Sequence, residues 1–117
     1  MSANNIIKKK SFRFSLSVLE LYKYMLDNRE YIISKQLLRC STSIGANIEE
    51  ALAGFSKKDF TAKMSIASKE ARETKYWLTI LNESNFIEKD LSNYIIEIDH
   101  IINILTKIVK TSSNNQK

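Results

Sequence analysis

The spacing of apolar residues between positions 33 and 81 most narrows what this chain can fold into. Apolar side chains recur there at intervals of three and four residues, the pattern of an α-helix with one buried face. The pattern breaks at Gly54-Phe55. Gly54 suits the end of one helix, and Ser56 with Asp59 suits the capping box of the next. We therefore predict two helices folded back on each other, whose inward line comprises Ile33, Leu37, Cys40, Ile44, Ile48, Ala51, Phe55, Phe60, Met64, Ala67, Ala71, Leu78 and Leu81.

Charged residues on these two helices are predicted to lie opposite each other, at the same distance from the turn along the hairpin. Arg39 lies as far before the turn at Phe55 as position 71 lies after it, so Arg39 should face Glu70 and Glu73. An arginine held between two carboxylates can use several of its five donors and fix the pairing of the two helices. We interpret the three residues as a structural ion-pair network rather than a catalytic group, because stabilising networks also gather charges.

The whole chain is predicted to form one all-α domain, an antiparallel up-down four-helix bundle at residues 11–111. Its 117 residues include no proline and only two glycines, which suits helices joined by short turns. A basic flexible arm is expected at residues 1–10, and a disordered polar tail at residues 112–117. The four helices are expected to cover about residues 11–26, a segment from 31–34 to the turn at 54–55, residues 57–82 and residues 88–111.

Two single residues in the second helix carry separate expectations. Gly45 interrupts a helix, where glycine is less favourable than alanine by about 0.5–1 kcal/mol. Close approach of another helix is expected to compensate there, and a gentle kink is the alternative. Cys40 is the chain's one cysteine and lies on the apolar line, which indicates a buried, inert thiol. The sequence shows no signal-peptide pattern and no apolar run of membrane-spanning length, so a cytoplasmic location is expected.

The first and fourth helices carry wider apolar arcs than a monomeric bundle needs. Each has two apolar lines rather than one, and exposed apolar surface on that scale indicates a subunit interface. The alternative is a tightly wrapped core with scattered apolar residues on the surface. The lines are Phe12, Leu16, Leu19 and Leu26 with Phe14, Val18, Leu21 and Met25, and then Leu91, Ile95, Ile98, Ile102, Leu105 and Val109 with Ile87, Tyr94, Ile101, Ile104 and Ile108.

Three segments carry a resemblance to a known family. SIGANIEEA, SKKDF and KEARETKYWL, within a match from about Phe12 to Lys110, resemble the four-helix-bundle proteins encoded by intervening sequences in bacterial 23S ribosomal RNA genes. The chain is also similar to the accessory bundle protein of diversity-generating retroelements, a basic pentamer linked to nucleic acid and a reverse transcriptase. The resemblance implies an up-down bundle, a closed homopentamer and no established enzymatic activity. It also implies a nucleic-acid enzyme or ribosomal component as partner.

The residues themselves offer little for catalysis. Glu97 and His100 have the Glu-x-x-His spacing of di-iron bundles, but such a site takes this motif from two helices, and the chain has one histidine. The Arg-x₄-His spacing of some helical ribonucleases is missing, because Ile95 occupies the position of the arginine. No nucleophile elbow, Walker loop, dinucleotide-binding motif or Cys-x-x-Cys pair is present. We therefore expect no enzyme, no metal site and no cofactor.

Basic residues instead favour a nucleic-acid partner. The formal net charge is +5, which attracts polyanions without identifying them. A helical wheel places a basic stripe with one aromatic residue on the solvent face of the third helix, and the flexible arm could add more positive charge. The alternative is a solvated face in which Lys69 pairs with Glu73. The candidate residues are Lys58, Lys69, Arg72, Lys75 and Tyr76, together with Lys8, Lys9, Lys10 and Arg13.

These observations leave two functional hypotheses. The first is a non-enzymatic oligomeric bundle that binds RNA or DNA through basic surfaces, in a shape- or phosphate-driven and salt-dependent manner. The second is a protein–protein interaction scaffold with no nucleic-acid role, in which the basic charge serves solubility.

Overall fold

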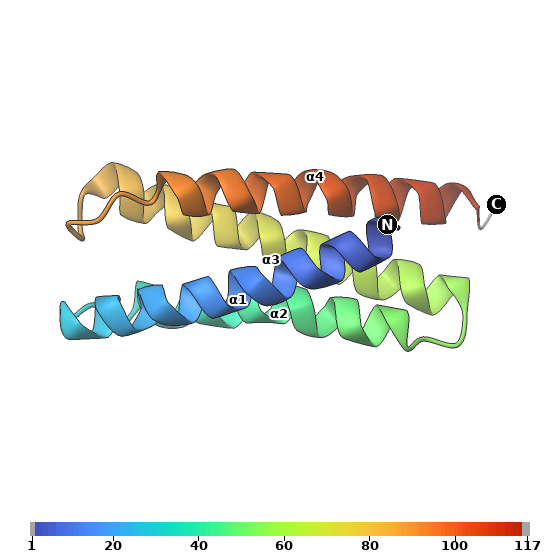
Figure 1. Cartoon of the computed structure of the whole chain (residues 1–117), viewed down its shortest axis with the longest axis horizontal. Helices are drawn as coiled ribbons and strands as arrows, with labels where there is room; N and C mark the ends of the chain where they lie inside the picture. The colour runs from blue at the N-terminus through green and yellow to red at the C-terminus, as the bar shows by residue number, and fades with distance from the viewer. Residues whose placement is uncertain (1, 116–117) are drawn as a thin grey trace.

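The computed structural model describes residues 2–115 and shows four helices packed as a bundle (Figure 1). They are α1 (Ala3–Asp27), α2 (Ile33–Leu52), α3 (Lys57–Ser84) and α4 (Ser92–Asn114). Successive helices run in opposite directions, as the sequence predicted, and the bundle measures 48 × 24 × 21 Å. Within the described residues, no helix is both long enough and apolar enough to cross a lipid bilayer.

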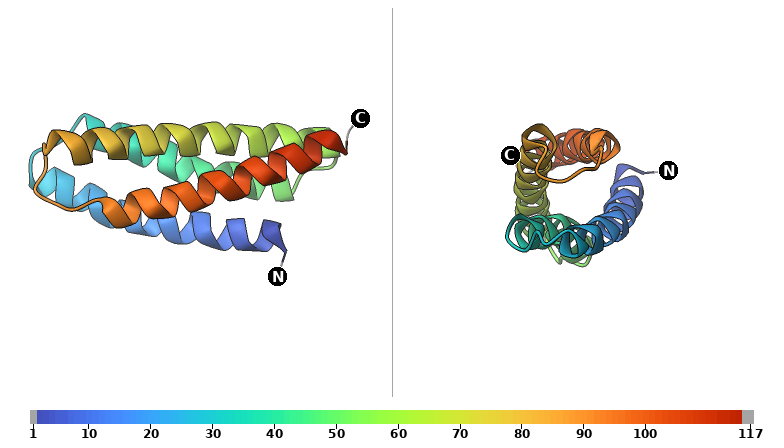
Figure 2. Two further views of the ribbon diagram at one scale, coloured as in Figure 1. Left: turned by 90° about the horizontal axis from the view of Figure 1, so that it is seen from above. Right: turned by 90° about the vertical axis from the view of Figure 1, so that its left-hand side faces the viewer.

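The helices form a square in which each contacts its two neighbours. α2 packs on α1 and α3, and α4 packs on α3 and α1. In the described part of the chain, the backbones of α1 and α3 do not approach each other closely, because the two helices occupy opposite corners (Figure 2). Their outer faces therefore point in different directions, which matters for any surface that both helices were expected to share.

The hairpin of α2 and α3 follows the predicted apolar line. Most of its members are fully buried, while Ile33 and Phe60 are partly buried and pack against the core. Ser56 caps α3 by accepting the amide of Asp59 at 3.0 Å, as predicted. Gly54 ends the preceding turn by donating its amide to Ala51 at 3.2 Å. Phe55 was wrongly placed on the inward line: it is fully exposed at the tip of the turn, where no helix covers it.

The structure contradicts the predicted flexible N-terminal arm. α1 begins at Ala3, eight residues before the predicted start at Ser11, and Ser2 caps it by accepting the amide of Asn5 at 3.2 Å. Ile7 is fully buried in the core. This burial explains the extension, because a helix that carries an apolar anchor gains packing free energy that a polar arm lacks. The three lysines at positions 8–10 therefore lie on a helix.

The other helix boundaries differ in smaller ways. α2 begins at Ile33 and α3 ends two residues beyond the predicted Asn82. α4 begins at Ser92 rather than Glu88, since the Asp90 carboxylate accepts the Ser92 amide at 3.0 Å and fixes the start there. α4 then continues to Asn114, so residues 112–114 of the expected disordered tail are helical. Residues 116–117 of that tail lie outside the described residues.

The two wide apolar arcs, on α1 and α4, differ in how far the structure buries them. On α4 both lines are buried or partly buried, because the helix lies between α1 and α3 and packs on each. The expectation of surplus apolar surface on α4 was therefore wrong. On α1 only the line that includes Phe14 and Val18 is buried, and Phe12, Leu16 and Leu19 of the second line are 64%, 50% and 44% exposed. Among the predicted lines, the exposed apolar surface thus lies on α1, while Ile96 of α4, which belongs to neither line, is 52% exposed.

Gly45 faces α1 as expected, but the approach is not unusually close. A Cβ atom at Gly45 would lie 3.5 Å from Ser11 Oγ and 3.8 Å from Ser11 Cβ, an ordinary van der Waals contact. An alanine would therefore fit inside one protomer, and the α1–α2 packing does not require glycine.

Candidate nucleic-acid interface

The predicted ion-pair network bridges α2 and α3. Arg39 Nη1 lies 3.4 Å from the Glu70 carboxylate, and Arg39 Nη2 donates to Glu73. The guanidinium also donates to Gln36 Oε1, and Trp77 Nε1 donates to the same Glu73 oxygen at 3.0 Å. The arginine thus bonds to side chains on two helices, and the predicted pairing of Arg39 with Glu70 and Glu73 is present in the structure.

The predicted basic stripe on α3 is divided in the structure. Lys58, Lys69 and Tyr76 occupy the outermost line of α3 and are exposed. Arg72 and Lys75 turn toward α4: Arg72 Nη2 donates to Thr106 Oγ1 at 3.2 Å, and Lys75 Nζ lies 2.8 Å from the Asp99 carboxylate. Two of the four cations are therefore engaged within the bundle, which weakens the stripe as a phosphate-binding surface.

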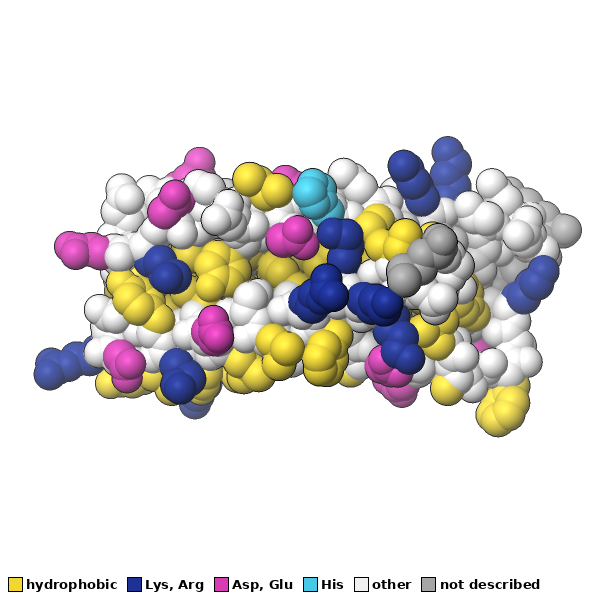
Figure 3. Space-filling view, viewed as in Figure 1, with side chains coloured by type: hydrophobic (Ala, Val, Ile, Leu, Met, Phe, Trp, Pro, Cys, Tyr) yellow, Lys and Arg dark blue, Asp and Glu magenta, His cyan; other side chains and the backbone are white. Residues whose placement is uncertain are grey.

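The basic residues of the former arm form a cluster on α1. Lys8, Lys9, Lys10 and Arg13 lie within two turns of the helix, and Figure 3 shows Lys and Arg side chains gathered on this face of the molecule. Lys8 Nζ lies 3.8 Å from the Glu49 carboxylate of α2, and Lys10 Nζ lies 3.7 Å from the Glu97 carboxylate of α4. Among residues 2–115, Lys9 and Arg13 enter no ion pair.

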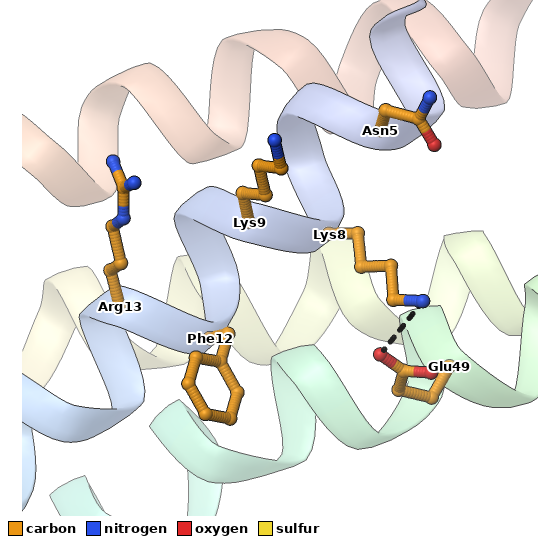
Figure 4. Close-up of a pocket in the computed structure, with 6 residues that line it drawn as sticks. All are labelled: Asn5, Lys8, Lys9, Phe12, Arg13 and Glu49. Atoms are coloured by element: carbon orange, nitrogen blue, oxygen red, sulfur yellow. Dashed lines mark ion pairs between the residues drawn. The ribbon is translucent and has the colours of Figure 1, made fainter.

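An open hollow of about 580 Å³ lies over this cluster. In Figure 4, Lys9 and Arg13 extend from one side of α1, while Phe12 and Lys8 extend from the other side toward α2. The hollow combines positive charge with an exposed aromatic ring, and Glu49 supplies the one carboxylate at its edge. Its lining residues are Asn5, Lys8, Lys9, Phe12, Arg13 and Glu49.

The structure does not join the two predicted basic sets into one surface. They lie on α1 and α3, at opposite corners of the bundle, with outer faces that point apart. Sequence reasoning assigned Phe12 to an apolar line of the first helix and did not place its ring beside these cations. The signal was available, since Lys8, Lys9 and Arg13 lie within one helical turn of Phe12 once the helix is extended to residue 3.

The cysteine and the histidine, the other potentially reactive side chains, each lie close to a neighbouring side chain. Burial raises the pKa of the Cys40 thiol, whose sulfur accepts a hydrogen bond from Thr74 at 3.2 Å. His100 Nδ1 lies 3.7 Å from the Glu97 carboxylate on the surface of α4. Within the part of the chain that the structure describes, no group of three or more His, Cys, Asp or Glu side chains is placed to hold a metal ion.

Helix order, the bridged α2–α3 hairpin and the charged outer faces together describe a small all-α protein of the four-helix-bundle class. Within that class, the chain belongs to the 23S rRNA-intervening sequence protein family, whose sequence profile matches residues 3–107. This match confirms the family to which the sequence motifs pointed.

A solved structure supports the same assignment. The chain is similar to a protein of unknown function from the S23 ribosomal protein family of Bacteroides thetaiotaomicron, with 39% sequence identity and a TM-score of 0.88. The match covers 93% of this chain and 99% of the other. Among curated proteins, none matches the chain significantly.

Proposed function

We propose that this protein is a non-enzymatic helical bundle that assembles into a closed homo-oligomer and binds RNA or DNA through basic surfaces. The observation that carries the proposal is the α1 cluster, in which four cations lie within two turns of one rigid helix. Lys9 and Arg13 form no ion pair among residues 2–115, so their charge is available to phosphates. The names of the family and of its solved relative refer to ribosomal RNA and ribosomal protein, which favours RNA of ribosomal origin.

Assembly would strengthen such binding. Leu16 and Leu19 leave an apolar strip on α1, and covering it with a second copy removes that surface from water. The family resemblance favours five copies, and a ring would multiply the net charge of +5 that each copy carries. A nucleic-acid enzyme or a ribosomal component is the partner we propose, in the cytoplasm.

Salt-titrated binding alongside a mass measurement tests this function. Fluorescence anisotropy would follow a structured ribosomal RNA fragment and a duplex DNA, with binding expected to weaken steeply between about 50 and 200 mM salt. Sedimentation should give a multiple of the protomer mass. If neither nucleic acid binds at low salt, the proposal is wrong and the interaction scaffold becomes the better hypothesis.

Two matched charge reversals distinguish the basic faces. Lys9→Glu with Arg13→Glu alters the α1 cluster, and Lys69→Glu with Arg72→Glu alters α3. The α1 pair should weaken binding more, because Arg72 already donates to Thr106 within the bundle. Circular dichroism should show both variants folded, since all four side chains lie at exposed positions and the bond from Arg72 to Thr106 is on the surface. Unchanged binding in both would contradict a role for either face.

A further inference from the structure

The α1 hollow contains more than phosphate-binding charge. Phe12 is 64% exposed, and its ring extends from the same two turns that carry Lys8, Lys9 and Arg13. An exposed phenylalanine has no hydrogen-bonding group, so its ring leaves apolar surface in water beside three cations. A flat apolar ring beside fixed cations matches one ligand chemistry closely: a nucleotide, with a planar base and an anionic phosphate.

The aromatic residue on α3 lacks this setting. Tyr76 is also exposed, but its ring packs edge-on against Trp77 with centroids 5.2 Å apart. Its neighbouring cations, Arg72 and Lys75, are held by α4. The α1 hollow is therefore the better site for a base with its phosphates.

From this geometry we infer that the α1 hollow binds an unpaired base of single-stranded RNA or DNA, with Phe12 stacking on the base and Lys9 and Arg13 contacting the flanking phosphates. The inference rests on the proposed nucleic-acid binding and narrows the ligand to single-stranded nucleic acid. In a duplex each base face is covered by the next base pair, so Phe12 could stack only at an end. An unpaired strand leaves that face free, and every base offers one, so binding would tolerate many sequences.

Glu49 offsets part of the positive charge of this site. Its carboxylate lies 3.8 Å from Lys8 Nζ, and both side chains are more than half exposed. A phosphate that reaches Lys8 must compete with Glu49 and bring a second negative charge near it. Glu49→Gln removes the competitor without altering the shape of the side chain, so it should tighten single-strand binding by about two- to five-fold.

The matched control for this charge change is Glu83→Gln in the last turn of α3. Both variants remove one negative charge, but Glu83 lies at the other end of a bundle 48 Å long. That separation exceeds the Debye length of about 8 Å at physiological salt, so Glu83→Gln should leave affinity nearly unchanged.

The aromatic ring is tested with Phe12→Ala, Phe12→Leu and Phe12→Tyr. Binding to a labelled uridine oligomer, a thymidine oligomer and a long duplex of equal nucleotide content would be measured by anisotropy. Phe12→Ala and Phe12→Leu should weaken both single strands by at least about five-fold, and Phe12→Tyr should retain affinity. Duplex binding should change little. Phe86→Ala is the control, because Phe86 is 67% exposed in the turn between α3 and α4, away from the hollow.

Different failures have different meanings. If the wild-type protein binds duplex and single strands equally, and Phe12→Ala changes neither, the stacking inference is overturned while the proposed nucleic-acid binding stands. If the wild type binds none of the three probes, both are overturned. Sedimentation of Phe12→Ala and Phe12→Leu is run in parallel. A smaller mass for Phe12→Ala would make Phe12 a subunit contact and would also overturn the inference.

Discussion

Glu30 gives the sharpest test of how this bundle is held together. The residue is only 5% exposed and precedes α2. One carboxylate oxygen accepts the amides of Ile32 and Ile33 at 3.1 Å each, and the other accepts the amide of Ser34 at 2.5 Å. The first amides of a helix have no partner within it, so Glu30 satisfies three such donors; the bond from Ser34 is buried, and those from Ile32 and Ile33 are partly buried.

The loss expected from Glu30→Gln follows from these bonds. A glutamine side chain presents one NH₂ group, so it must turn a donor toward at least one of the three amides. Leaving a buried donor unsatisfied costs about 1–3 kcal/mol. Removing a negative charge from a helix N-terminus costs about 0.3–1 kcal/mol more. We therefore expect the free energy of unfolding to fall by about 2–3 kcal/mol, which for a chain of this size lowers Tm by roughly 10 °C.

Equilibrium urea denaturation followed by circular dichroism measures this change. The control is Glu88→Gln, which removes the same charge from an exposed position in the turn before α4. It should alter the unfolding free energy by less than about 0.5 kcal/mol. A Glu30→Gln protein as stable as this control would refute the reasoning, because a buried carboxylate that binds three amides cannot be replaced without a measurable loss.

Three further predictions concern α2. Gly45→Ala should raise the unfolding free energy by about 0.5–1 kcal/mol, since its Cβ fits against Ser11; a lower urea midpoint would contradict this. Arg39→Lys should lower the unfolding free energy by about 1 kcal/mol, because a lysine ammonium cannot bridge two carboxylates as the forked guanidinium of arginine does. A double-mutant cycle with Glu73→Gln should show the coupling between the two residues. Burial raises the pKa of Cys40 above its ordinary 9.0, so stability is full below that pH and falls as pH rises past it. Cys40→Ala should show a smaller fall between about pH 8 and 10.5 in urea titrations, and an equal fall would contradict the assignment.

The sequence predicted the fold where periodicity and side-chain reach settle the outcome. The α2–α3 hairpin needed only the apolar spacing and the cap at Ser56, and Arg39 could be paired with Glu70 and Glu73 by counting residues from the turn. Both inferences use local geometry, since a helix rises about 1.5 Å per residue along each arm. Nothing more distant than one hairpin had to be known.

The features that the sequence did not predict depend on packing between helices that are distant in the chain. The helical state of residues 3–10 depends on Ile7, which is buried only because α1 packs against the rest of the bundle. The burial of the α4 isoleucines depends on the position of α4 between two neighbouring helices. A helical wheel does not show how much of the apolar arc those neighbours cover. The capping role of Glu30 requires the chain to turn at Arg29, which has φ of 63°, and helical periodicity does not report such a backbone conformation.

The extension of α1 changes how its positive charge can act. A flexible arm must be ordered when it binds, at roughly 1–2 kcal/mol for each residue fixed. On α1 that ordering is complete before any ligand arrives, because Ile7 already anchors the helix in the core. Binding through Lys9, Phe12 and Arg13 would therefore use a preformed surface. Deleting residues 2–10 cannot test it, since the deletion would also remove Ile7 and destabilise the bundle. Substitutions on the outer face alone separate binding from folding.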